Sequence, residues 1–162
     1  MKYISFAIPC YNSEAYMANA VESILKGGED VEIIIVNDGS KDRTSEIAHE
    51  FEAKYPTIIK AVDKENGGHG DAVNTGLEHA TGKYFKVVDS DDWVNEEALC
   101  KILEVLKKFE TNNEEIDMLI SNYVYEKEGM EHKKVIEYRN VLPQDMIFSW
   151  NDIKRFHLGQ YI

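Results

Sequence analysis

Four short and almost uninterrupted apolar runs constrain the fold of this chain more than any other feature of its sequence. They are Ile4 to Ile8, Ile33 to Val36, Ile58 to Val62 and Phe85 to Val88. Strands covered on both faces form continuous apolar runs, whereas strands with one face in water alternate apolar and polar residues. The runs therefore predict buried strands of a parallel sheet.

Apolar residues with helical spacing follow each of these runs. They lie between Met17 and Leu25, Ile47 and Tyr55, Gly70 and Ala80, and Leu99 and Phe109. Strands that alternate with helices predict an α/β fold, in which a doubly wound, mostly parallel sheet carries helices on both faces.

Local signals predict where these helices begin and end. Asp42 and Asn95 precede the second and fourth helices, where a side-chain oxygen can accept a hydrogen bond from a free N–H group. Gly27 and Gly28 follow the first helix and favour a left-handed cap. We expect a helix boundary at each of these positions.

The pattern changes after residue 112. Met118 to Tyr125 and Val135 to Tyr138 predict an antiparallel pair of strands, joined through a polar segment that contains Gly129, and a short helix is expected from Trp150 to Phe156. We therefore expect two parts, residues 1–112 and 113–162, and a fold that is incomplete at its C-terminus.

Composition narrows the possible partners. The 30 acidic and 18 basic side chains give a net charge of −12 without a basic cluster, which argues against nucleic acid. Cys10 and Cys100 have no Cys or His at metal-ligand spacing, so reduced thiols and a cytoplasmic location are expected. No run approaches the roughly 20 apolar residues of a membrane span.

Polar segments follow all four predicted strands. They are PCYNSE (Pro9 to Glu14), NDGS (Asn37 to Ser40), NGGHGD (Asn66 to Asp71) and DSDDW (Asp89 to Trp93). Ligands of open α/β sheets bind beyond the carboxyl ends of the strands. We therefore expect the four segments to meet at one crevice.

Three carboxylates crowd the last of these segments, at Asp89, Asp91 and Asp92. Neighbouring ionised carboxylates repel one another, and a hard divalent cation relieves that repulsion. Mg²⁺ or Mn²⁺ bound to one or two of them would complete its shell with diphosphate oxygens. The alternative is a solvated turn whose acids precede a helix.

The first two segments could line a nucleoside pocket. Asp38 could accept a hydrogen bond from the N–H of a base, Tyr11 could stack on that base, and Asn12 or Glu14 could contact neighbouring polar groups. The alternatives are an ordinary Asp-Gly turn after the second strand and a turn begun by Pro9 after the first.

Glycines surround a histidine in the NGGHGD segment. Backbone N–H groups near Asn66, Gly67 and Gly70 could approach a pyrophosphate at the start of a helix. His69 could contact phosphate, although a single loop histidine is more often incidental. The segment lacks the third glycine of the dinucleotide fingerprint and follows the third strand, which disfavours a dehydrogenase.

Taken in order, PCYN, VNDGS, NGGHGDAVNTG and VVDSDDW resemble the family 2 glycosyltransferases, which have the GT-A fold. The resemblance spans Met1 to about Leu106. It implies that Asp38 recognises the base, typically uracil, and that the segment from Pro9 to Glu14 lines the same pocket.

The resemblance also implies a metal-dependent donor site. Asp89, Ser90 and Asp91 match the DxD element, which binds the ribose and the Mg²⁺ or Mn²⁺ that contacts the donor diphosphate. Asp91 and the adjoining Asp92 are the metal ligands that we expect. Val73 departs from the family, because many members have arginine there.

The activity implied is transfer of a sugar from a UDP-linked donor to the hydroxyl group of a carbohydrate or glycolipid acceptor, with inversion, in the synthesis of cell-surface polymers. Residues 1–112 would bind the donor, and residues 113–162 would begin the acceptor side. The general base is expected beyond Ile162.

Two other functions stay open, and a third, that of a sugar nucleotidyltransferase, fits poorly. A phosphatase of the haloacid dehalogenase type would use Asp89 as nucleophile and Asp91 as acid, but its motif should follow the first strand. Sugar nucleotidyltransferases place a glycine-rich basic loop where this chain has PCYNSE. The chain could also bind a nucleotide and transfer nothing.

Overall fold

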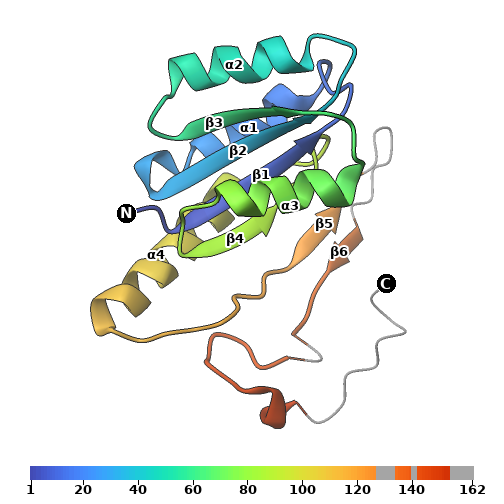
Figure 1. The fold of residues 1–162 in the computed structure, drawn as a ribbon. Coiled ribbons are helices and arrows are strands. Elements are labelled where there is room, and N and C mark those ends of the chain that lie inside the picture. Colours follow the sequence, from blue (N-terminus) through green and yellow to red (C-terminus); the bar gives the residue numbers. More distant parts are fainter. Residues whose placement is uncertain (127–133, 140–141, 154–162) are drawn as a thin grey trace. The chain divides into compact units, whose positions relative to one another are not determined.

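The computed structural model describes residues 1–126, 134–139 and 142–153 (Figure 1). Backbone contacts divide the chain into two units, Met1–Asn113 and Glu114–Ile162, and each is described by itself. The predicted link through Gly129 and the end of the predicted helix at Phe156 lie outside the described residues. The assignment of the two parts to donor and acceptor stays a prediction.

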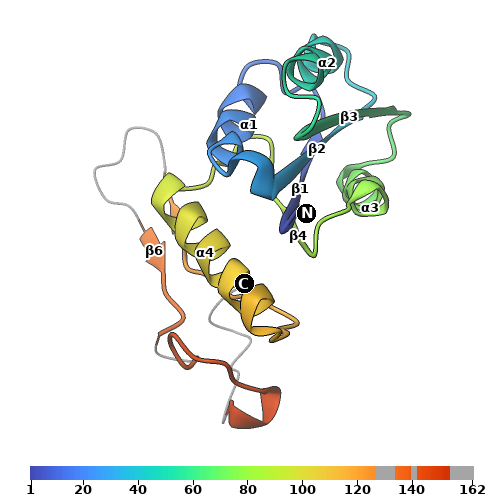
Figure 2. The same ribbon diagram turned by 90° about the vertical axis from the view of Figure 1, so that its left-hand side faces the viewer.

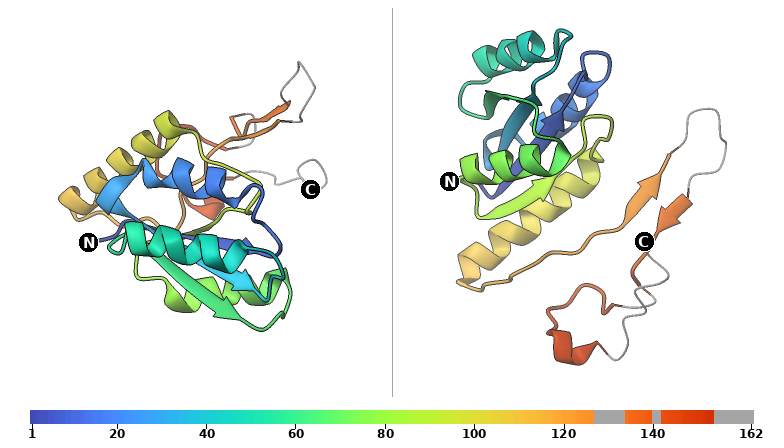
Figure 3. Two further views of the ribbon diagram at one scale, coloured as in Figure 1. Left: turned by 90° about the horizontal axis from the view of Figure 1, so that it is seen from above. Right: turned by 45° about the vertical axis from the view of Figure 1, so that its right-hand side comes forward.

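The first unit alternates strands and helices in the predicted order. Its elements are β1 (Ile4–Cys10), α1 (Met17–Leu25), the 3-10 helix η1 (Gly28–Asp30), β2 (Val31–Asp38), α2 (Thr44–Lys54), β3 (Ile59–Lys64), α3 (His69–His79), β4 (Tyr84–Val87) and α4 (Glu96–Asn112). The four strands form one parallel sheet in the order β3-β2-β1-β4. All four arrows point toward the same edge of this sheet (Figures 1 and 3).

Helices cover both faces of the sheet. The strand order runs outward from β1 to β3 and then returns to the other side of β1 for β4. Right-handed crossovers therefore put α1 and α2 on one face and α3 on the other (Figure 2). The contacts agree, since α3 packs on β1 and β2 while α4 packs against α1. The predicted α/β fold is confirmed.

The two central strands form the core. All seven residues of β1 are buried, and so is every residue of β2 except Glu32. On one face, Ile34 and Val36 pack against Ala72 of α3. The same helix lies so close to β1 that a Cβ atom on Gly76 would be 2.5 Å from the Cβ of Ala7. The predicted burial is thus confirmed for β1 and β2. It is wrong for β3, where only Ile59 is buried, and for β4, where no residue is buried, because these two strands lie at the edges of the sheet.

Asn95 caps α4 as predicted, since its side chain accepts a hydrogen bond from the N–H of Ala98 at 2.9 Å. Asp42 is not the N-cap of α2, because that position belongs to Arg43. Its carboxylate instead accepts from the N–H of Thr44 at 3.0 Å and from the Thr44 hydroxyl at 2.6 Å. Asp42 lies one residue before the N-cap and therefore binds Thr44, the first residue of the helix.

The predicted left-handed cap of α1 is wrong in its position. The C-cap is Lys26, with right-handed backbone angles, and Gly27 is also right-handed. Of these two glycines, only Gly28 has a positive φ, of 58°. It begins η1, which leads directly into β2.

The second unit contains the predicted antiparallel pair in a shorter form. β5 (Tyr123–Tyr125) pairs with β6 (Lys134–Ile136), and Val124 lies opposite Val135. Residues 118–122 are not in a strand, because the ladder in the described ranges spans only three residues a side. The expected helix begins as a 3-10 turn, η2 (Trp150–Asp152).

Within the described ranges, every helix is too short or too polar to cross a lipid bilayer.

Candidate functional site

The carboxyl ends of the four parallel strands lie at one edge of the sheet, and the candidate residues follow them (Figure 1). The loops concerned are β1–α1, β2–α2, β3–α3 and the segment after β4. Edges of this kind are where open α/β sheets bind ligands. The contacts among these loops decide what each candidate side chain is free to do.

Asn12 and Glu14 connect the first loop to the second. The Asn12 N–H donates to the Ser40 hydroxyl at 2.9 Å, and its side-chain oxygen accepts from the N–H of Lys41 at 2.8 Å. The Glu14 carboxylate accepts from the N–H of Arg43 at 2.8 Å. Both side chains thus have partners inside the protein, and their contact with a ligand stays a prediction.

Pro9 lies inside β1 and does not begin a turn, which corrects that alternative. The carbonyl oxygen of Ala7 accepts from Val88, so alternate residues of β1 direct their backbone groups toward β4. The pairing with β4 ends at Ala7. At Pro9 no residue of β4 is left to accept a hydrogen bond, so the missing N–H of proline costs nothing. Strands tolerate proline at such positions.

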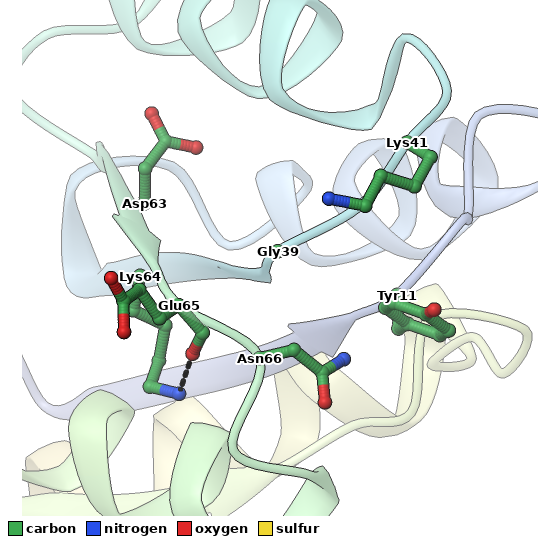
Figure 4. A pocket seen from close by; sticks show the side chains of 7 residues that line it. All are labelled: Tyr11, Gly39, Lys41, Asp63, Lys64, Glu65 and Asn66. Atoms are coloured by element: carbon green, nitrogen blue, oxygen red, sulfur yellow. Dashed lines mark hydrogen bonds between the residues drawn. The ribbon is translucent and has the colours of Figure 1, made fainter.

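An open pocket of about 710 Å³ lies beyond the ends of β1, β2 and β3. Tyr11, Gly39, Lys41 and residues 63–66 line it (Figure 4). Tyr11 is 52% exposed at the edge of this pocket. Its ring is accessible to a planar ligand, and the stacking on a base stays a prediction.

Asp38 is buried beneath this pocket and is not among its lining residues. Its carboxylate accepts from Lys64 Nζ at 2.7 Å and from the N–H groups of Gly67 and Gly68, each at 2.8 Å. Burial alone would raise the pKa of Asp38, but these hydrogen bonds outweigh it and lower that pKa. The expected contact with a base stays a prediction.

The β3–α3 loop is fixed on the end of β2 by the same set of contacts. Lys64 also pairs with Asp71 at 2.6 Å, and the Asn66 amide donates to the carbonyl oxygen of Asp38 at 2.9 Å. The N–H of Gly67 is already used by Asp38, so in this arrangement it does not face a pyrophosphate. For Gly70, the approach of a phosphate remains a prediction.

The segment after β4 forms a turn, in which the N–H of Asp92 donates to the carbonyl oxygen of Asp89 at 3.0 Å. Ser90 is buried, and its hydroxyl lies 3.0 Å from that of Ser13. Partial burial and the charges of Asp91 and Asp89 raise the pKa of Asp92. The turn thus brings three carboxylates close together, and Lys86 offsets their effect on the pKa of Asp92 only in part.

His69 joins this turn to the β3–α3 loop. Its Nε2 lies 2.9 Å from a carboxylate oxygen of Asp89, across two loops that follow different strands. The sequence placed His69 beside a phosphate. The structure gives it a protein partner, and that partner is one of the three crowded aspartates.

In the described part of the chain, no three His, Cys, Asp or Glu side chains converge well enough to enclose a metal ion. The donors that are present still suit a hard cation, because Mg²⁺ and Mn²⁺ prefer oxygen and commonly take only one or two carboxylates beside ligand phosphates. Burial and the charges of Asp91 and Asp89 raise the pKa of Asp92 more than Lys86 lowers it. Asp91 and Asp92 as ligands stay a prediction.

Two lysines of the site were missed in the sequence. Lys64 and Lys41 both line the pocket, one as the last residue of β3 and the other just beyond the turn after β2. Their place at strand ends was the available signal.

Comparison with known proteins agrees with this geometry. The family described as "Glycosyl transferase family 2" matches residues 5–151. The "Minor teichoic acid biosynthesis protein GgaB" of Bacillus subtilis is 38% identical over 71% of this chain and 13% of its own length. The "Glycosyltransferase GlyA" of Streptococcus pneumoniae is 30% identical over 96% of this chain and 23% of its own.

Among solved structures, S. aureus TarS 1-349 in complex with UDP-GlcNAc matches with a TM-score of 0.56 and 31% identity. The match covers 68% of this chain and 32% of that one. This chain therefore spans less than two thirds of each of these proteins. Since the family match covers most of its residues, the chain belongs to glycosyl transferase family 2.

Proposed function

We propose that this chain binds a nucleotide-diphosphate sugar, with UDP as the nucleotide, for transfer of the sugar to an acceptor hydroxyl. The observation that carries the proposal is the pairing of an open pocket beside Tyr11 with a group of aspartates at the same sheet edge. The family and the UDP-GlcNAc complex of TarS support it.

The base of the donor lies in the pocket against Tyr11, and its diphosphate extends toward Asp89, Asp91 and Asp92. Asp91 and Asp92 would hold a Mg²⁺ or Mn²⁺ ion, which would supply positive charge that favours departure of the nucleoside diphosphate. Asp89, positioned by His69, is available to the ribose through its other carboxylate oxygen. The carboxylates thus hold the donor and do not react with it.

The acceptor and the general base belong to the whole protein. An inverting transfer needs a base beside the acceptor hydroxyl, and we assign none within this chain. The name of GgaB suggests a cell-wall polymer, so the proposed acceptor is a carbohydrate or glycolipid of the cell surface.

Calorimetry with UDP tests the donor site. We expect binding that requires Mn²⁺ and that weakens by about tenfold or more in Asp91→Ala, because each charge-assisted contact contributes roughly 1.5 to 3 kcal/mol. Glu104→Ala, an exposed acid of α4, is the matched control and should bind as the wild type does. Equal binding with a chelator present, or in Asp91→Ala, would contradict the proposal.

A second measurement separates the alternatives. Hydrolysis of a generic phosphoester that disappears in Asp89→Asn would favour the dehalogenase-type phosphatase. Metal-dependent UDP binding without sugar transfer to any acceptor would indicate a nucleotide-binding chain that needs the rest of its protein.

A further inference from the structure

The two lysines that line the pocket differ in their partners. Lys64 Nζ contacts Asp38 at 2.7 Å, Asp71 at 2.6 Å and the carbonyl oxygen of Glu65 at 2.5 Å, so its charge is balanced inside the protein. Across residues 1–126, 134–139 and 142–153, no side chain or carbonyl oxygen pairs with the ammonium of Lys41. Figure 4 shows this ammonium beside the pocket without a bonded neighbour.

Asp63, an acid in the pocket lining, has partners other than Lys41. Asp63 accepts from Asn37 Nδ2 at 2.8 Å and from the Ser45 hydroxyl at 2.8 Å, and its other oxygen lies 2.7 Å from His49 Nε2. Both oxygens of the Asp63 carboxylate therefore already have partners, from β2 and α2. Of the two lysines that line the pocket, Lys41 is therefore the one whose ammonium is open to a ligand.

The backbone at Lys41 is fixed even though its side chain is exposed. Its N–H donates to the Asn12 side chain at 2.8 Å, and the Ser40 hydroxyl before it accepts from the Asn12 N–H at 2.9 Å. These reciprocal contacts hold the loop on which Lys41 stands. A donor carried by a fixed loop can distinguish between ligands, because moving it away from a group that cannot accept a hydrogen bond would cost free energy.

The strand order identifies the part of the donor that meets Lys41. The pocket is built from the ends of β1, β2 and β3, and none of its lining residues follows β4. The aspartates Asp89, Asp91 and Asp92 follow β4, on the other side of β1. A diphosphate at those aspartates leaves the base, at the opposite end of the nucleotide, over β2 and β3.

We infer that Lys41 selects the base of the donor by donating a hydrogen bond from Nζ to a ring carbonyl oxygen. An ammonium group has three donors and no acceptor, so it favours an oxo group and disfavours an exocyclic amino group. The pocket should therefore prefer uracil to cytosine, because uracil has an oxo group at the one ring position where cytosine has an amino group. The inference rests on the proposed function and names the class of nucleotide that the site takes.

Binding of UDP and CDP in the presence of Mn²⁺ tests this inference by calorimetry. The wild type should bind UDP more tightly than CDP, and Lys41→Met should weaken UDP binding by about tenfold while changing CDP binding by no more than about twofold. Lys60→Met removes a lysine from the exposed side of β3 and is the matched control, which should leave both affinities unchanged. Lys41→Arg keeps a donor and should retain the preference for UDP.

Each other outcome has a separate meaning. Equal loss of UDP and CDP binding in Lys41→Met would show that Lys41 contacts the ribose or phosphates, and would overturn the inference. Affinities for both nucleotides equal to those of the wild type would also overturn it. Failure of the wild type to bind either nucleotide would refute the proposed function itself. Because the Lys41 side chain is exposed, we expect Lys41→Met to unfold at the same temperature as the wild type. Such a result excludes misfolding as the cause of weaker binding.

Discussion

The carboxylate of Asp38 accepts its three hydrogen bonds from the protein itself. A buried carboxylate without partners would be costly to ionise. The ammonium of Lys64 and the N–H groups of Gly67 and Gly68 compensate for burial, so the pKa of Asp38 is lowered. One ionised group thereby fixes a loop that lines the pocket.

This arrangement predicts how stability depends on pH. The folded-state pKa of Asp38 lies below its ordinary value of 3.8, so the stabilisation is present above that value and is lost as the pH falls through the folded-state pKa. We expect Asp38→Asn to unfold at a lower temperature than the wild type at about pH 6, and this difference to shrink below pH 3.8.

Thermal unfolding followed by circular dichroism between about pH 6 and pH 3 measures this difference. Asp117→Asn, which changes an exposed acid, is the control and should follow the wild type at each pH. A deficit in Asp38→Asn that stays constant through the acid range would show that ionisation of Asp38 does not contribute.

At the scale of the elements, α3 packs closely against the sheet at Gly76. Gly76 faces Ala7 of the central strand, and Ala7 is 0% exposed. A side chain at Gly76 has no room unless helix and strand separate. The glycine therefore sets the distance between α3 and β1, and through it the position of the loop that begins at the end of β3.

Replacing this glycine should destabilise the fold. Gly76→Ala gains up to about 1 kcal/mol of helix propensity, but its Cβ would be 2.5 Å from that of Ala7, and overpacking of a core costs about 1 to 3 kcal/mol. We expect a lower midpoint in urea unfolding. Gly70→Ala in the same helix meets nothing within 4 Å, so its midpoint should be unchanged or higher. Equal midpoints for the two variants would show that α3 can move without cost.

At the scale of the whole molecule, burial differs strongly between the two units. β1 is buried along its whole length, whereas all three residues of β5 are exposed, as are Lys134 and Val135 of β6. Amides open at a free energy that follows local burial and packing, up to that of global unfolding. The two sheets should therefore differ in protection.

Hydrogen exchange measured by mass spectrometry tests this difference. We expect peptides from β1 and β2 to exchange only through global unfolding, and peptides from β5 and β6 to exchange orders of magnitude faster. Peptides from α2, whose helix is exposed on one side, serve as an internal reference and should be intermediate. Exchange in β5 as slow as that in β1 would mean that the second unit is part of one cooperative fold.

Several features of the fold and site could be predicted because they depend on neighbours in the sequence. Apolar runs marked the four strands of the sheet, although only β1 and β2 are buried along almost their whole length. Asn95 was recognisable as a cap because its partner Ala98 is three residues away. The order of motifs at strand ends was sufficient to recognise the family. The cap at Asp42 failed because the choice between adjacent positions depends on how the loop is held.

The sequence by itself determined the alternation of strands and helices, the sheet edge to which the polar segments belong, and the family of the chain. Only the tertiary structure decided which of those polar side chains are occupied. Asn12 pairs with Lys41, Asp38 with Lys64 and His69 with Asp89, across separations of 29, 26 and 20 residues. The physical reason is that hydrogen bonds between loops depend on the order of strands in the sheet, which no local pattern of residues encodes.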